Sequence, residues 1–137
     1  MDKISLIMQQ THIASLLSRR LDLSLSVHGI NFTEFSVMYH LFAAHESKLS
    51  RIALAEKIGL TASGVTRVLA PMEKNHLTTK ESNPRDARQS LVVLTQTGME
   101  VLENALVTIE DSTDIIFSLL SEKELDTLLG LLSRLKC

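Results

Sequence analysis

A short run of polar side chains near the middle of the chain combines hydrogen-bonding chemistry with helical spacing. It consists of Thr61, Ala62, Ser63, Thr66 and Arg67. Small and hydroxyl side chains let a helix lie close to the edges of stacked bases, and a guanidinium group can bind a guanine edge or a phosphate through paired hydrogen bonds. We therefore expect these residues to contact DNA, with Thr61 also serving as the N-cap of the helix.

A second polar group follows a turn signal later in the chain. Arg85 and Arg88 flank Asp86, directly after the pair Asn83-Pro84, which favours a turn. An arginine at the tip of a hairpin can enter a narrow minor groove, where the negative potential is high. We expect Asp86 to hold one of the arginines in position through a bidentate ion pair.

The first polar group belongs to the second of two short helices. Leu54, Ala55 and Ile58 form the apolar face of the first helix, and Gly59 then interrupts the pattern. The apolar residues of the second helix are Val65, Val68, Leu69 and Met72. They recur at helical spacing and face away from the polar group, so the sequence predicts a helix-turn-helix.

Two predicted strands hold the second polar group. Leu77–Glu81 and Ser90–Leu94 are rich in strand-forming residues and enclose the polar segment 82–89. Leu49 and Ser50 could add a short third strand at the edge. A β-hairpin directly after a helix-turn-helix is a wing.

Two features of the second helix are unusual. Pro71 lies in its last turns, where it removes the backbone donor to the Arg67 carbonyl and should bend the helix. Asn75 and His76 follow where a glycine would be the ordinary helix stop. Both residue types tolerate the left-handed conformation, so we expect the helix to end there.

These motifs together resemble the MarR family of winged helix-turn-helix transcription regulators. The resemblance rests on Leu54-Ala55, Gly59-Leu60-Thr61, Val65-Thr66-Arg67, Met72-Glu73-Lys74, Arg85-Asp86-Ala87-Arg88 and Leu94-Thr95 with Gly98. It covers nearly the whole chain, and the arginine–aspartate motif is its most specific part. It implies a mainly α-helical fold with a small β-wing, and a homodimer that binds a pseudo-palindromic operator in double-stranded DNA, usually as a repressor. A small-molecule effector often releases such dimers.

The 137 residues form one domain by length. The resemblance implies a DNA-binding lobe over residues 33–94 and a helical dimerisation region over residues 1–30 and 95–137. The helices expected in the dimerisation region carry more apolar residues than a single winged lobe can cover. Packing across a dimer axis is the expectation, and packing within one chain is the alternative.

Charge is distributed unevenly along the chain. The net charge is −2 in total, but residues 50–94 carry +3 and residues 95–137 carry −5. The net positive charge thus falls on the winged segment, where phosphate contacts would be made. The single cysteine, Cys137, excludes an internal disulfide and fits a reducing cytoplasm. No signal peptide or membrane span is expected.

A ligand pocket is expected between the winged lobe and the long helices. Its candidate lining is His12, Leu16, Met38 and Met72. Plain core packing is the alternative for all four residues. An apolar lining with few charges would suit a neutral or weakly acidic aromatic molecule.

Other functions fit the sequence less well. His40 and His45 are too far apart along a helix to share a metal ion, and no cysteine or histidine pair accompanies them. No glycine-rich phosphate loop or nucleophile elbow indicates an enzyme, and no cofactor is expected. The remaining alternative is a helical dimer that binds a protein partner without affinity for DNA.

Overall fold

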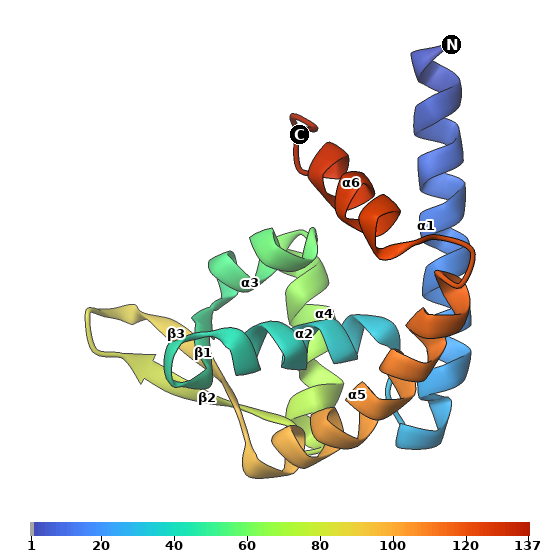
Figure 1. Cartoon of the computed structure of the whole chain (residues 1–137). Coiled ribbons are helices and arrows are strands. Elements are labelled where there is room, and N and C mark those ends of the chain that lie inside the picture. The colour runs from blue at the N-terminus through green and yellow to red at the C-terminus, as the bar shows by residue number, and fades with distance from the viewer. Residues whose placement is uncertain (1) are drawn as a thin grey trace.

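The computed structural model describes residues 2–137, which form six α-helices, two short 3-10 turns and a small sheet (Figure 1). In chain order the elements are α1 (Lys3–Leu25), η1 (Ser26–His28), α2 (Phe32–Ala43), η2 (His45–Ser47), β1 (Lys48–Ser50), α3 (Arg51–Ile58), α4 (Ala62–Lys74), β2 (Thr78–Asn83), β3 (Asp86–Leu94), α5 (Gln96–Ile116) and α6 (Glu122–Leu132). The mainly α-helical fold with a β-wing is confirmed.

Helices α3 and α4 form the predicted helix-turn-helix. Gly59 ends α3 in the left-handed conformation, with φ of 69°, which a glycine adopts without the strain that a Cβ atom would add. The Thr61 hydroxyl then accepts a hydrogen bond from the Gly64 amide at 3.1 Å and caps α4. The turn and the cap were both predicted.

The sheet has the order β1-β3-β2, with both pairs antiparallel. Leu49 pairs with Val92, so the suggested third strand forms at the edge. The predicted wing strands were too short: β2 runs to Asn83 and β3 begins at Asp86. Polar side chains do not prevent this extension, because the backbone groups make the ladder, and a register irregularity after Ser82 accommodates it.

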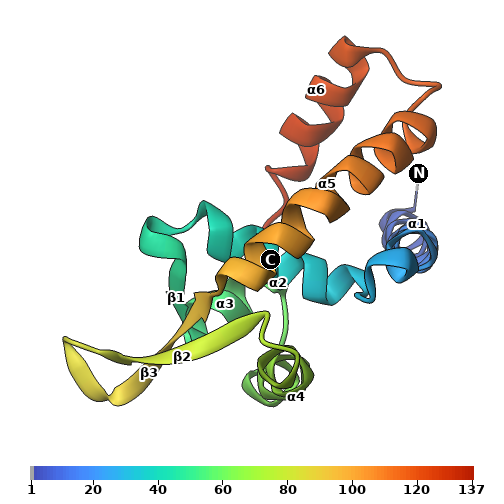
Figure 2. The ribbon, with the colours of Figure 1, turned by 90° about the horizontal axis from the view of Figure 1, so that it is seen from below.

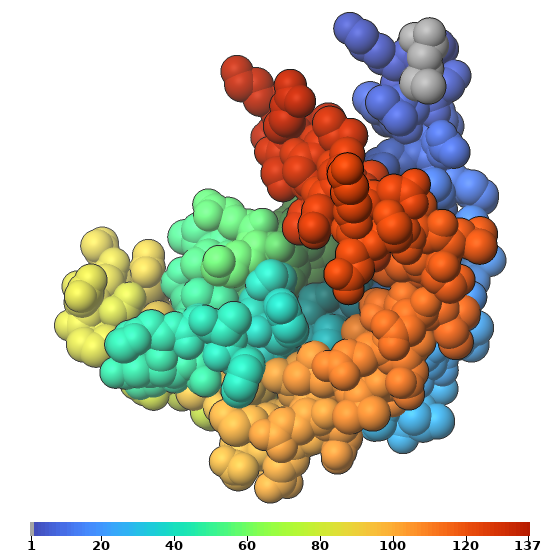
Figure 3. All heavy atoms as spheres, viewed as in Figure 1, coloured from blue at the N-terminus to red at the C-terminus, as the bar shows by residue number. Residues whose placement is uncertain are grey.

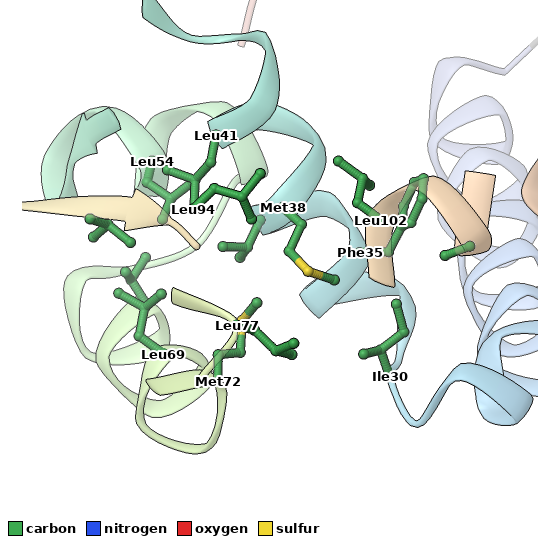
Figure 4. Packing of buried hydrophobic residues seen from close by; sticks show 14 of the residues in the cluster. Ile30, Phe35, Met38, Leu41, Leu54, Leu69, Met72, Leu77, Leu94 and Leu102 are labelled. Carbon is green, nitrogen blue, oxygen red and sulfur yellow. The ribbon is translucent and has the colours of Figure 1, made fainter. Parts of the chain in front are cut away.

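The core joins the winged lobe to α5. Its buried residues include Leu25, Phe35, Met38, Leu41, Leu54, Leu69, Met72, Val92 and Leu102. Figure 4 shows the labelled side chains of α2, α3 and α4 meeting those of the sheet and α5. One continuous cluster therefore fixes the orientation of α4.

Thr95 connects the segment that follows α4 to α5. Its hydroxyl oxygen lies 2.6 Å from the His76 carbonyl oxygen and 3.0 Å from that of Leu77, and it accepts a hydrogen bond from the Gly98 amide at 2.9 Å. The same side chain thus caps α5 and binds the segment that leaves α4. Gly98 is needed there, because a Cβ atom would lie 2.2 Å from the Leu77 carbonyl oxygen.

Local hydrogen bonds mark the starts of two further helices. Helix α2 begins at Phe32, where the Asn31 side chain and Glu34 form a capping box. Helix α5 ends at Ile116. Ser121 and Glu124 have the spacing of a capping box in the sequence, and they form one at the start of α6.

Helix α1 packs against α2 and α5 through its C-terminal part, where Leu21 and Leu25 are buried. Its N-terminal part rises from the body of the chain in Figure 3, and Figure 2, in which α1 is seen end-on, shows α6 lying clear of it. Helix α6 has no buried residue, and Ile7 of α1 is 63% exposed. A single chain therefore leaves the apolar faces of both helices uncovered.

Helix α4 continues through Pro71 to Lys74. His76 then adopts the left-handed conformation, with φ of 62°, and the Leu77 amide donates a hydrogen bond to the Met72 carbonyl at 2.9 Å. The predicted left-handed stop therefore falls on His76. No helix of residues 2–137 combines the length and apolar character needed to cross a membrane.

Candidate nucleic-acid interface

The exposed face of α4 carries all the residues predicted from the helix-turn-helix. Thr61, Ala62, Ser63, Thr66 and Arg67 are exposed, whereas Val65, Leu69 and Met72 of the same helix are buried. The Thr61 and Ser63 hydroxyl oxygens lie 3.2 Å apart, at the helix N-terminus. Hydroxyl groups, backbone donors and the positive end of the helix dipole therefore share one end of this face.

Thr66 is held by a contact that the sequence did not predict. Its hydroxyl donates a hydrogen bond to the Ala62 carbonyl at 3.2 Å and accepts one from Arg51 Nη1 at 3.3 Å. Arg51 begins α3, so the first helix of the motif contacts the exposed face of the second. This contact restricts the orientation of the Thr66 hydroxyl.

The side chains of Asn83 and Asp86 hold the backbone at the tip of the wing. Asn83 Oδ1 accepts a hydrogen bond from the Arg85 amide at 3.0 Å. Asp86 Oδ1 accepts the Arg88 amide at 3.0 Å and Arg88 Nε at 3.4 Å. The pairing of Asp86 with Arg88 is therefore present, but a single carboxylate oxygen makes it, so the expected bidentate geometry is wrong. The Arg88 side chain is 92% exposed and its terminal nitrogens are available to a ligand.

An ion pair braces the base of the wing. Lys48 Nζ on β1 donates a hydrogen bond to Glu81 Oε1 on β2 at 2.7 Å, across the central strand β3. The hydrogen bond to Glu81 raises the pKa of Lys48 above its ordinary value, and Glu46 adds to the effect. Lys48 therefore stays charged and ties the two edge strands together.

A hollow of about 210 Å³ lies between α3 and the wing. Its lining is Ser50, Arg51, Ile52, Arg88, Gln89 and Ser90. Arg51 of the helix-turn-helix and Arg88 of the wing thus border the same space. The two groups of residues that the sequence identified separately are connected by this hollow.

The four candidates for a ligand pocket lie in two settings. Met38 and Met72 are completely buried in the core, where Figure 4 shows both among the core side chains. His12 and Leu16 lie on α1, and Leu16 is 44% exposed. These residues do not enclose a common cavity within one chain.

A different cavity of about 410 Å³ lies between α1, α2 and α5. Its lining is Leu21, Phe32, Phe35, Ser36, Tyr39, His40, Leu106, Ile109 and Thr113. Burial, with a smaller effect from Lys57, lowers the pKa of His40 from 6.5. The cavity therefore joins aromatic rings to an imidazole that favours its neutral form. Within residues 2–137, no three His, Cys, Asp or Glu side chains lie together as metal ligands.

Arg51 and Glu73 were not predicted to take part in this surface, although Glu73 belongs to the Met72-Glu73-Lys74 motif of the family resemblance. Arg51 Nη2 lies 3.7 Å from Glu73 Oε1, and Lys80 Nζ lies 3.7 Å from Glu73 Oε2. The only signal in the sequence is that Arg51 directly follows the suggested edge strand of Leu49 and Ser50. Nothing in the local pattern indicates that these side chains would meet.

The comparisons with known proteins agree with this geometry. Residues 21–105 match the family described as transcriptional regulator SarA/Rot. The HTH-type transcriptional regulator YkoM of Bacillus subtilis, whose function is uncharacterized, is 33% identical over 107 residues, which cover 78% of this chain and 68% of YkoM.

Solved structures show the same fold. A mutant of MarR from E. coli, complexed with operator DNA, superposes with a TM-score of 0.85 at 23% identity, over 96% of this chain and 94% of that one. Sco3205 of Streptomyces coelicolor, a MarR family regulator in complex with DNA, has a TM-score of 0.83 at 23% identity, over 97% and 86% of the two chains. The helix-turn-helix, the wing and the family match together show that the chain belongs to the MarR-type winged helix-turn-helix transcriptional regulators, within the family described as transcriptional regulator SarA/Rot.

Proposed function

We propose that the chain acts as a homodimeric repressor that binds a pseudo-palindromic operator and releases it when a small effector binds. The observation that carries this proposal is the two-sided character of α4, which has a polar, exposed face opposite an apolar, buried one. Arg88 of the wing borders the same hollow as Arg51 at the start of α3. The similarity to two proteins solved with DNA supports the same reading.

Each subunit would place α4 in a major groove. Ala62, Ser63, Thr66 and Arg67 would contact base edges or phosphates, and Thr61 would add a phosphate contact to its role as cap. Arg85 and Arg88, steadied by Asp86, would reach the flanking minor groove. The two recognition helices of a dimer would lie about one turn of DNA apart.

The exposed apolar surface suggests which part of the chain binds DNA and which part forms the dimer. Residues 33–94 would bind DNA, and residues 1–30 and 95–137 would form the dimer. The exposed leucines of α6 include Leu129 at 66% and Leu131 at 53%. Exposed apolar patches of this kind mark interaction surfaces, and a second copy would cover them.

The effector would bind beside the helices that join the two regions. We infer that the cavity around Phe35, Tyr39 and His40 takes a neutral or weakly acidic aromatic molecule, and that His12 and Leu16 contribute only if the partner subunit brings them near it. The mostly apolar lining supports this choice of ligand. The molecule would act by binding more tightly to the dimer geometry that cannot hold DNA.

Fluorescence anisotropy tests the DNA-binding proposal. The purified protein is titrated against duplex DNA from upstream of its own gene and against a scrambled duplex, with Arg88→Ala in parallel. We expect selective binding that weakens steeply with salt, because phosphate contacts release counterions. Arg88→Ala should cost about 1–3 kcal/mol on the native duplex, as for one lost specific contact.

Two other outcomes have distinct meanings. Selective binding that does not change between low and high salt would contradict the proposed phosphate contacts. An intact dimer with no affinity for any duplex at low salt would favour the alternative that the chain binds a protein partner.

A further inference from the structure

A single carboxylate connects the two helices of the motif with the wing. Glu73, near the end of α4, lies 3.7 Å from Arg51 Nη2 through Oε1 and 3.7 Å from Lys80 Nζ through Oε2. Its side chain is 28% exposed, and Oε1 is buried without a hydrogen-bond partner. Glu73 therefore attracts two cations from elements that precede and follow α4.

Of the two cations near Glu73, Arg51 is less exposed than Lys80. Its side chain is 30% exposed, and its guanidinium group donates a hydrogen bond to the Thr66 hydroxyl at 3.3 Å and faces Glu73. The same residue borders the hollow that Arg88 shares from the wing. Arg51 thus lies between the exposed face of α4 and the wing, so a DNA backbone that contacted both would pass close to it.

We propose that Arg51 is a further DNA-contacting residue and that Glu73 positions it for selective binding. This inference rests on the proposed DNA-binding function. Some N–H groups of the Arg51 guanidinium contact DNA, while the others are held by Glu73 and Thr66. Glu73 also competes with phosphate for Arg51, so an incorrectly seated duplex gains little from this arginine.

The mechanism depends on the planar shape of the guanidinium group. A guanidinium has five N–H donors in a fixed fork, so it can face a carboxylate, a hydroxyl and a phosphate at once. A lysine at position 51 keeps the charge but cannot keep this geometry. Charge and positioning can therefore be separated by substitution.

The experiment compares selective with unselective binding in four variants of the full-length protein. The probes are a duplex enriched from a randomised pool by the wild-type protein and a shuffled duplex of the same composition. The variants are Arg51→Gln, Arg51→Lys, Glu73→Gln and the double variant of Arg51→Gln with Glu73→Gln. Affinity is measured over a range of salt concentrations, and circular dichroism with the melting temperature checks folding.

We expect each arginine variant to reduce the ratio of the two affinities. Arg51→Gln should weaken binding to the enriched duplex about tenfold and make the salt dependence shallower by about one counterion. Arg51→Lys should lower the ratio while the salt dependence stays as in the wild type. This second variant keeps the test valid if a neutral residue at position 51 disturbs folding.

Glu73→Gln should strengthen binding to the shuffled duplex and reduce the affinity ratio about three- to tenfold, because Arg51 is then free to bind any phosphate. In the double variant the ratio should equal that of Arg51→Gln alone, since Glu73 acts through Arg51. Glu56→Gln is the matched control: Glu56 is an exposed carboxylate on α3, and its loss changes the net charge equally. It should leave the ratio unchanged.

The failures are distinguishable. If the wild type selects no duplex, both the proposed function and this inference are overturned. If the wild type is selective but Arg51→Lys and Glu73→Gln keep its affinity ratio, this inference alone is wrong. If folded Glu73→Gln bound both duplexes more weakly by the same factor, the inference would also be wrong, because a residue with a purely structural role would give that result.

Discussion

Gly98 is the glycine whose surroundings leave least space for a side chain. It lies at the start of α5, beside the Leu77 backbone that connects α4 to β2. An added Cβ atom would come within 2.2 Å of the Leu77 carbonyl oxygen and 2.7 Å of Leu94 Cδ1. The nearest atom belongs to the backbone, so the change cannot be absorbed by a side-chain rotation.

Gly98→Ala should therefore lower the free energy of unfolding by about 2–3 kcal/mol, as overpacking of a rigid site does. Gly130→Ala is the matched control within a helix, because a Cβ atom at Gly130 has no atom within 4 Å. That control should raise stability by about 0.5–1 kcal/mol. Urea unfolding at one protein concentration measures both, and equal effects would contradict the argument.

His40 gives stability a pH dependence on the acidic side. Burial lowers its pKa from 6.5 in the folded chain, so the unfolded chain binds its proton more readily. The contribution of neutral His40 is fully present above pH 6.5 and is lost as the pH falls through the lower folded value. The free energy of unfolding should thus decrease as the pH falls from about 6.5 towards the lower pKa of the folded chain.

His40→Gln should remove this part of the pH dependence. His45→Gln is the control, because the His45 side chain is 94% exposed. Thermal melting over a series of acidic buffers makes the comparison. A steeper loss in His40→Gln than in the wild type would show that the sign is wrong.

At the scale of elements, α4 combines a binding face with an internal proline. Pro71 provides no backbone donor for the Arg67 carbonyl, and yet the helix continues to Lys74. The buried Leu69 and Met72 on either side of the proline keep this turn packed against the core. Packing in the core therefore compensates for the missing hydrogen bond.

Pro71→Ala should raise the free energy of unfolding by about 1–2 kcal/mol, since the restored hydrogen bond outweighs the greater freedom of the unfolded chain. Pro84→Ala at the wing tip should instead lower it by about 0.4–1 kcal/mol, because only the unfolded-state restriction is lost there. Chemical unfolding of both variants tests the opposite signs. A loss of stability in Pro71→Ala would mean that its ring contributes more by packing than its missing donor costs.

Elements with short-range signals could be predicted from the sequence. Gly59 with Thr61, and Ser121 with Glu124, fix helix ends through contacts within a few residues. The Arg51 contacts could not be predicted, since they depend on how α3, α4 and the wing cross in space. The length of the wing strands was also underestimated, because backbone pairing extends them over side chains that carry no strand signal.

At the scale of the whole molecule, apolar surface is concentrated on the helices outside the winged lobe. Ile7 on α1 and Ile52 on α3 have the same exposure, 63%. Only Ile7 belongs to the proposed dimerisation region. The two isoleucines therefore form a matched pair for testing where two copies meet.

Ile7→Glu should weaken dimerisation at least about tenfold, because a carboxylate would be buried without a partner. Ile52→Glu should leave the dimer intact, although its negative charge near DNA should reduce DNA affinity. Sedimentation velocity over a range of concentrations measures the dimer. Equal weakening by both substitutions would place the contact elsewhere or indicate general unfolding.

The contacts of Thr95 couple the orientation of α5 to the end of α4. One hydroxyl binds the segment that leaves α4 and the start of α5, so a rotation of α5 about this point would be passed on to the end of α4. The 21 residues of α5 span about 30 Å, so a tilt of about 5° at Thr95 displaces the far end by about 3 Å. In the proposed dimer the far ends are held, and the same tilt instead swings the recognition helices. A ligand that wedges α5 slightly away from α2 would thereby move α4 out of register with the grooves without unfolding any part of the chain.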